Sequence, residues 1–141
     1  MTQEKRIIAV DPGQKRIGLA LSDPTMTIAS PLCVLKHISL VVDAAQISQM
    51  AEDNHAILIV IGQALGPDGE ETASSRHARK LADAIEAQKT IQVVLFDESG
   101  STQMARQARV EMRVNREKRS GHLDALAATV ILQNYLDERT V

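Results

Sequence analysis

Three acidic residues stand at positions where a folded chain could bring them together. Asp11 ends the apolar run 6–11 and begins an Asp-Pro-Gly turn, Glu98 closely follows the apolar run 91–96, and Asp124 lies in the first turn of a predicted C-terminal helix. The ends of strands in α/β sheets are where ligands commonly bind. Converging carboxylates repel one another unless a cation neutralises them. The pattern therefore predicts a cation site at Asp11, Glu98 and Asp124.

The chemistry of such a site would be hydrolysis by a metal-activated water. Carboxylate oxygens suit Mg²⁺ or Mn²⁺, and a pair of such ions roughly 3.5–4 Å apart activates a water and stabilises the leaving oxygen. Each acid taken alone also has an ordinary structural explanation. Asp11 could shape its turn, Glu98 could be solvated, and Asp124 could complement a helix dipole.

Basic residues are concentrated in one segment, and the rest of the chain has a net negative charge. Residues 106–119 carry a local net charge of +4, whereas the whole chain of 141 residues carries −2. On a continuing helix, four arginines at i, i+3, i+7 and i+10 would share one face that could follow a phosphate backbone. A solvated basic face is the alternative. The candidate nucleic-acid-binding residues are Arg16, Arg106, Arg109, Arg113, Arg116, Lys118 and Arg119.

Composition excludes several classes of protein. Phe96 and Tyr135 are the only aromatic residues, so a base-stacking surface is not expected. Cys33 is the only cysteine, which excludes an internal disulfide, and no His or Cys pair has the spacing of a structural zinc site. No run is long and apolar enough for a membrane span, so we expect a cytoplasmic protein.

The elements that would position these residues follow from turns and periodicity. Strands are predicted over 6–11, 16–22 and 28–35, which form an antiparallel meander. A helix over 39–53, with Ser39 as a possible N-cap, precedes a strand over 57–61 that is apolar throughout, as expected of a central strand. A helix over 72–88 and a buried strand over 91–96 follow.

The C-terminal part is predicted to be helical. One helix spans about 103–114, and a last helix spans 122–138, with Leu123, Ala127, Val130, Ile131 and Tyr135 on its core side. Residues 1–141 therefore form one α/β domain, with a mixed five-stranded sheet and helices packed on it.

Three sequence blocks resemble those of a known family. They are Asp11-x-Gly13-x-x-Arg16-x-Gly18 with Ser22-Asp23-Pro24 beyond it, Phe96-Asp97-Glu98-x-x-Ser101-Thr102, and Asp124-x-Leu126-Ala127-Ala128 with Ile131-Leu132-Gln133-x-Tyr135-Leu136-Asp137. In matching order, they resemble the YqgF (RuvX) family of Holliday junction resolvases and pre-16S rRNA-processing nucleases.

The resemblance implies an RNase H-like fold and a metal-dependent nuclease acting on structured nucleic acid, with Mg²⁺ or Mn²⁺ held by Asp11, Glu98 and Asp124. It leaves open whether the substrate is branched DNA or precursor rRNA, and whether the protein is a monomer or a homodimer. The chain departs from the family pattern at Ser99-Gly100, at residues 62–64 and at residues 66–69.

Two other functions are compatible with the sequence. A binding module could keep the fold but have lost cleavage through the altered loops at Ser99-Gly100 and residues 66–69. The strand-turn-strand around Asp11 also resembles the phosphate loop of actin-like ATPases, but those enzymes close two such domains around a nucleotide, and 141 residues supply one. His122, two residues before Asp124, could contact a metal or phosphate, although an exposed histidine is the more ordinary interpretation.

Overall fold

The computed structural model describes residues 4–88, 91–98, 110 and 125–139. Five strands form one mixed sheet in the order β3-β2-β1-β4-β5. The strands are β1 (Arg6–Pro12), β2 (Arg16–Ser22), β3 (Ala29–Lys36), β4 (Ala56–Gln63) and β5 (Gln92–Asp97). The first three strands are antiparallel to one another, and β4 and β5 run parallel to β1. The predicted meander and mixed sheet are confirmed.

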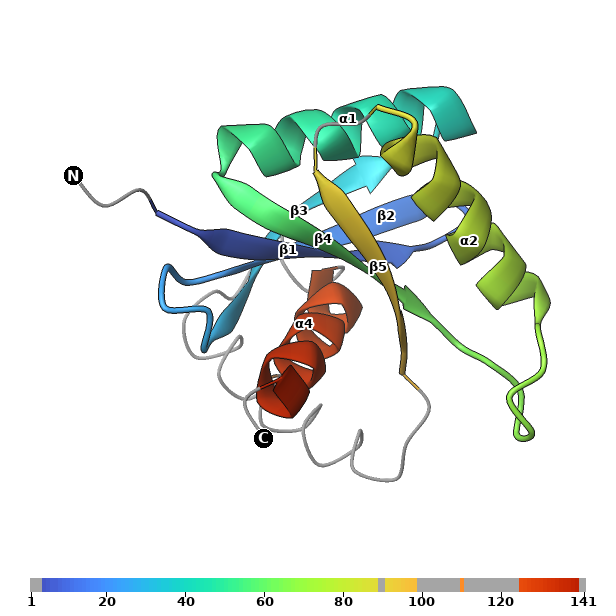
Figure 1. The fold of residues 1–141 in the computed structure, drawn as a ribbon. Coiled ribbons are helices and arrows are strands. Elements are labelled where there is room, and N and C mark those ends of the chain that lie inside the picture. Colours follow the sequence, from blue (N-terminus) through green and yellow to red (C-terminus); the bar gives the residue numbers. More distant parts are fainter. Residues whose placement is uncertain (1–3, 89–90, 99–109, 111–124, 140–141) are drawn as a thin grey trace.

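Helices cover both faces of the sheet (Figure 1). Helices α1 (Leu40–Asp53) and α2 (Ala73–Glu86) lie on one face, and α4 (Leu126–Arg139) crosses the other. The predicted cap of α1 is present, because the Ser39 hydroxyl accepts a hydrogen bond from the Val42 N–H at 3.2 Å. In α2, Thr72 and Ser75 form a reciprocal capping box. No helix in the described ranges is long and apolar enough to cross a membrane.

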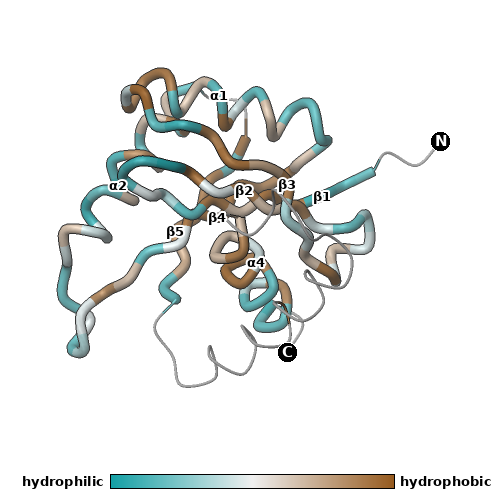
Figure 2. The backbone as a smooth tube through the Cα atoms, turned by 180° about the vertical axis from the view of Figure 1, so that it is seen from behind, coloured by the Kyte–Doolittle hydropathy of each residue, from teal (hydrophilic) through white to brown (hydrophobic). Residues whose placement is uncertain are grey.

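Two apolar clusters hold these layers together, one on each face of the sheet. Figure 2 shows the hydrophobic backbone concentrated along the strands and the inner sides of the helices. The cluster under α1 and α2 includes Ile8, Val10, Ile59 and Ile61, and the cluster under α4 includes the alternating residues Ile7, Ala9, Val60, Ile131 and Leu132. Strand β4 contributes to both clusters, which confirms it as a central strand.

Two details of the expected packing are wrong. The sequence predicts a buried β5, but this strand lies at the edge of the sheet, and among its residues only Val93 is buried. In α4, Ala127 is exposed, whereas the predicted core residues Val130 and Ile131 are buried and Tyr135 packs against the cluster under α4. Ala128, Leu132 and Leu136 complete the core side, and Leu123 lies outside the described residues. Periodicity does not exclude Ala127 because the helix is apolar around most of its circumference.

Helix α4 contacts both edges of the sheet, near β3 on one side and at β5 on the other. The Gln133 side chain accepts a hydrogen bond from Ala29 N–H at 3.0 Å and donates one to the Thr27 carbonyl at 3.0 Å. The rings of Phe96 on β5 and Tyr135 on α4 meet edge to face, with centroids 5.7 Å apart. These contacts fix the position of α4 across the sheet, from the start of β3 to the end of β5.

Candidate active site

Asp11 and Glu98 lie at the same end of the sheet and on the same face. Strands β1 and β5 run in the same direction, and both acids lie at the C-terminal ends of these strands: Asp11 near the end of β1, and Glu98 directly after β5. Side chains alternate between faces along a strand, and Ala9 and Phe96, two residues before each acid, both belong to the cluster under α4. Asp11 and Glu98 therefore point to the α4 side of the sheet.

Gly62 occupies the strand between the two acids. Gly62 pairs with Phe96 in β5, and on its other side the β1 register places Val10 opposite Ile61, so Asp11 follows beside Gly62. The Glu98 N–H donates to the Gln63 carbonyl at 3.0 Å, which holds Glu98 against the end of β4. The backbones of β1 and β5 are two strand spacings apart, or roughly 10 Å.

The Glu98 carboxylate lies over Gly62. A Cβ atom added to Gly62 would fall 2.8 Å from Glu98 Oε2 and 2.5 Å from Ile131 Cδ1. Because Gly62 has no side chain, both the Glu98 carboxylate and Ile131 of α4 can approach the backbone of β4 at this position. The sequence did not identify Gly62 as part of the site. Its only signal was that it keeps the glycine of the family's usual G-L-P, which Gln63 and Ala64 then depart from.

Asp11 lies in an environment that disfavours its ionised form. Its side chain is partly buried, and this desolvation raises the pKa of the carboxyl above its ordinary value. Among the described residues, no cation or hydrogen-bond donor offsets the loss of water around Asp11. A cation brought to this carboxylate would favour ionisation and relieve the cost.

The turn after Asp11 requires glycine at position 13. The Gly13 N–H donates to the Asp11 carbonyl at 2.9 Å, and a Cβ at Gly13 would fall 2.1 Å from the Arg16 carbonyl oxygen. The backbone of Arg16 therefore approaches too closely for any other residue. This tight turn follows β1, which ends at Pro12, one residue beyond the predicted range 6–11, and β2 starts at Arg16 as the sequence predicted.

Several predicted site residues lie outside the described part of the chain. They are Asp124, Arg106, Arg109, Arg113, Arg116, Lys118 and Arg119, together with His122 and the altered pair Ser99-Gly100. No group of three or more metal-ligating side chains occurs among the residues that are described, so only Asp11 and Glu98 of the predicted triad are placed. Helix α4, which follows Asp124 in the sequence, is placed against Gly62 through Ile131.

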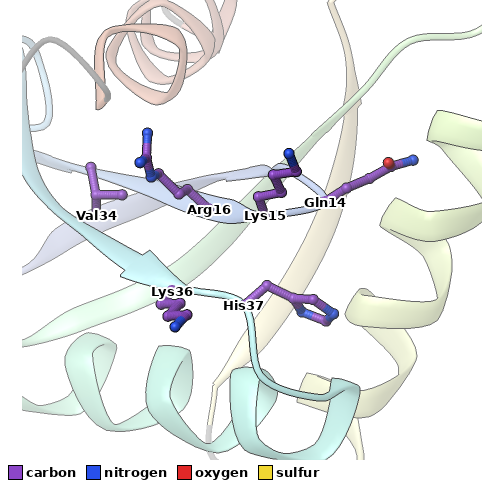
Figure 3. Close-up of a pocket in the computed structure, with 6 residues that line it drawn as sticks. All are labelled: Gln14, Lys15, Arg16, Val34, Lys36 and His37. Atoms are coloured by element: carbon purple, nitrogen blue, oxygen red, sulfur yellow. The ribbon is translucent and has the colours of Figure 1, made fainter.

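Arg16 is exposed at the first position of β2 and lines a pocket (Figure 3). The pocket has a volume of about 850 Å³ and is lined by Gln14, Lys15, Arg16, Val34, Lys36 and His37. Figure 3 shows Lys15 and Arg16 extending to the side of the strands that faces α4. The sequence identified Arg16 but missed Lys36. The pairing of β2 with β3, which brings them together, cannot be seen in any short motif.

Comparison with known proteins gives consistent results. The family model RuvX, described as Holliday junction resolvase, matches residues 5–138. A protein of Acidiphilium cryptum (strain JF-5), named "Putative pre-16S rRNA nuclease", is 36% identical over 97% of this chain and 87% of its own length. A protein of the same name from Anaeromyxobacter sp. (strain Fw109-5) is 38% identical over 95% of this chain and 98% of its own.

Solved structures show the same fold. RuvC of T. thermophilus in complex with a Holliday junction substrate has a TM-score of 0.66 at 12% identity, and the match covers 96% of both chains. The fowlpox virus Holliday junction resolvase has a TM-score of 0.56 at 14% identity, covering 96% of this chain and 99% of the other. The predicted RNase H-like fold is confirmed.

Proposed function

Because the chain belongs to the RuvX family, we propose that it is a metal-dependent nuclease that hydrolyses phosphodiester bonds of structured nucleic acid. The observation that supports this most directly is the placement of Asp11 and Glu98. The two carboxylates lie on one face at one end of the sheet, on either side of a glycine whose missing side chain leaves space between them.

The residues present fit a hard divalent cation. Two carboxylates supply oxygen ligands of the kind that Mg²⁺ and Mn²⁺ prefer, and Asp124 would supply a third. The space at Gly62 is one that a Cβ atom would fill, and the raised pKa of Asp11 indicates a carboxylate that gains from a nearby positive charge. Asp11, Glu98 and Asp124 would hold the ion or ions.

Catalysis would divide between the bound metal and the fold. When bound, Mg²⁺ or Mn²⁺ lowers the pKa of water and offsets the charge of the leaving oxygen. Asp11 holds its carboxylate in a partly dehydrated position at the end of β1, where electrostatic interactions are stronger than in bulk water. Glu98 is held against β4 by its own N–H, so its carboxylate reaches over Gly62 from a rigid backbone.

Basic residues would position the nucleic acid. Arg16 stands on the same hairpin as Asp11. Arg106, Arg109, Arg113, Arg116, Lys118 and Arg119 precede Asp124 in the sequence and would contact backbone phosphates without reading bases. Their replacement is therefore expected to weaken the binding of all sequences about equally.

For the substrate, we favour precursor 16S rRNA over branched DNA. The relatives at 36–38% identity carry a pre-16S rRNA nuclease name, whereas the junction-bound RuvC shares 12% identity and supports the fold alone. Such a substrate would place the protein in the cytoplasm, acting as a single domain over residues 1–141.

Cleavage assays with a matched control test this function. The purified protein is incubated with a labelled structured RNA containing a 16S rRNA precursor end, and with a four-way DNA junction, in Mg²⁺, Mn²⁺ or EDTA. We expect metal-dependent cleavage of the RNA by the parent and by Asp83→Asn, an exposed α2 variant, but none by Asp11→Asn or Glu98→Gln.

Other outcomes would change the conclusion. Junction cleavage without RNA cleavage would reverse the substrate preference and keep the nuclease. Binding without hydrolysis in every metal, by folded protein, would replace the nuclease with a binding module of the same fold. Equal cleavage by Asp11→Asn and the parent would refute the assigned site.

A further inference from the structure

The pocket beside the β1–β2 turn concentrates positive charge at the same end of the sheet as the acids. Lys15, Arg16 and Lys36 each carry a full positive charge, and no acidic residue lines this pocket in the described structure. The chain as a whole carries a net charge of −2. This local excess of cations is therefore a feature of the site and not of the composition.

Two of these cations stand on paired residues of neighbouring strands. Arg16 and Lys36 are directly opposite in the β2–β3 register. Like charges in this position destabilise an antiparallel pair. An anion bound at the pocket would be attracted by both of these charges.

Main-chain contacts hold the pocket in shape. The His37 N–H donates to the Lys15 carbonyl at 2.9 Å, which joins the hairpin tip to the end of β3. The buried Asp43 carboxylate in α1 accepts hydrogen bonds from His37 Nδ1 and from the Ile38 N–H, the latter at 3.0 Å. These contacts fix the segment after β3 against α1, beside the hairpin tip.

The pocket lies a short distance from the acids. Asp11 is opposite Gly18 in the β1–β2 pair, so Arg16 is its diagonal neighbour at roughly 7–8 Å, and β3 lies one further strand spacing of about 4.8 Å away. At about 3.4 Å of rise per nucleotide, this range corresponds to roughly two to four nucleotides.

We propose that this pocket binds backbone phosphates of the substrate strand that flanks the cleavage point, with Lys15, Arg16 and Lys36 as the cations. The proposal rests on the nuclease function above and adds a path for the strand, from the acids at β1 and β5 outward across β2 and β3. The six lining residues include three cations and no Phe, Tyr or Trp, so the pocket is suited to phosphate more than to bases.

Salt-dependent binding separates this proposal from the nuclease function. Binding of a fluorescein-labelled single-stranded RNA is measured by anisotropy in EDTA at several KCl concentrations. The double variant Lys15→Ala/Lys36→Ala is compared with Lys5→Ala/Lys80→Ala, which removes the same charge at exposed positions outside the pocket. For a single strand, removing one cation that neutralises a phosphate reduces the slope of log K against log salt by about 0.7.

We expect the slope of the pocket variant to fall by about 1.4, because two such cations are removed, while the control keeps the parent slope and Lys36→Arg keeps it as well. Equal slopes for the pocket variant and the parent would overturn the proposal, as would an equal fall in the control. If the parent cleaves RNA and the pocket variant binds with an unchanged slope, the pocket proposal fails alone. If the parent neither binds nor cleaves, both fail.

Discussion

Gly62→Ala is expected to disturb the site and the packing of α4 at once, through two separable contacts. The new methyl carbon would lie 2.5 Å from Ile131 Cδ1 and 2.8 Å from Glu98 Oε2, whereas ordinary van der Waals contacts begin near 3.4 Å. Ile131 is fully buried and cannot move away freely, so the stability cost comes mainly from that residue. The Glu98 carboxylate is the end of a flexible side chain and would be displaced.

The magnitude follows from the cost of overpacking. Inserting a methyl group into a packed core costs about 1–3 kcal/mol. For a chain of 141 residues this corresponds to a fall in Tm of about 3–10 °C. Cleavage would fall further than stability alone explains, because the displaced carboxylate is one of the proposed metal ligands.

A second substitution separates the two effects. Ile131→Val removes Cδ1, and on its own it costs about 0.5–1.5 kcal/mol. In Gly62→Ala/Ile131→Val the added methyl group occupies part of the vacated space, and only the milder contact with Cγ1 of residue 131, at 3.0 Å, remains. The double variant is therefore expected to be more stable than Gly62→Ala. The contact with Glu98 remains, so cleavage would not recover.

Thermal unfolding of the four proteins in EDTA, together with cleavage rates in Mn²⁺, tests this reasoning. A Gly62→Ala protein with parental Tm and activity would show that the close approach of Ile131 and Glu98 is not a constraint. Recovery of activity together with stability in the double variant would show that Gly62 acts only through α4, and would remove the argument that it makes room for the carboxylate.

Three further predictions concern titration and the attachment of α4. Burial raises the folded-state pKa of Asp11, so its ionisation costs stability as pH rises above the unfolded value of 3.8. In thermal unfolding in EDTA, Asp11→Asn should therefore be more stable than the parent at pH 7 and equally stable at pH 3. For Asp23, slight burial raises the pKa, but hydrogen bonds from the Ile28 and Thr27 N–H groups and the Thr25 hydroxyl outweigh burial and lower the pKa to about 2. The stability that ionised Asp23 contributes is therefore present above pH 3.8 and is lost as pH falls toward 2. Acid unfolding of Asp23→Asn should show a weaker dependence on pH over that window, and an unchanged profile would contradict the assignment. Gln133→Ala removes two hydrogen bonds to the loop before β3 and should lower the free energy of unfolding by about 1–3 kcal/mol in urea titrations, whereas Glu138→Ala, at an exposed position of the same helix, should have little effect.

The sequence by itself determined features that depend on neighbours along the chain. Ser39 could be predicted as a cap because a hydroxyl before an amphipathic segment reaches an N–H three residues on. The strand around Asp11 and its turn could be predicted because proline and glycine break a β run. The three family-like blocks also determined the family, since their types and order are properties of the sequence.

The tertiary structure alone decided how distant residues meet. Strand order placed Gly62 between Asp11 and Glu98, although 51 and 36 positions separate it from them in the sequence. It also placed Lys36 opposite Arg16 and made β5 an edge strand. Each outcome depends on the pairing of strands through backbone hydrogen bonds, which are the same for every residue type and so leave little trace in the local sequence. The sequence gives the types of side chain available, but strand pairing and helix packing set the distances between them on which a site depends.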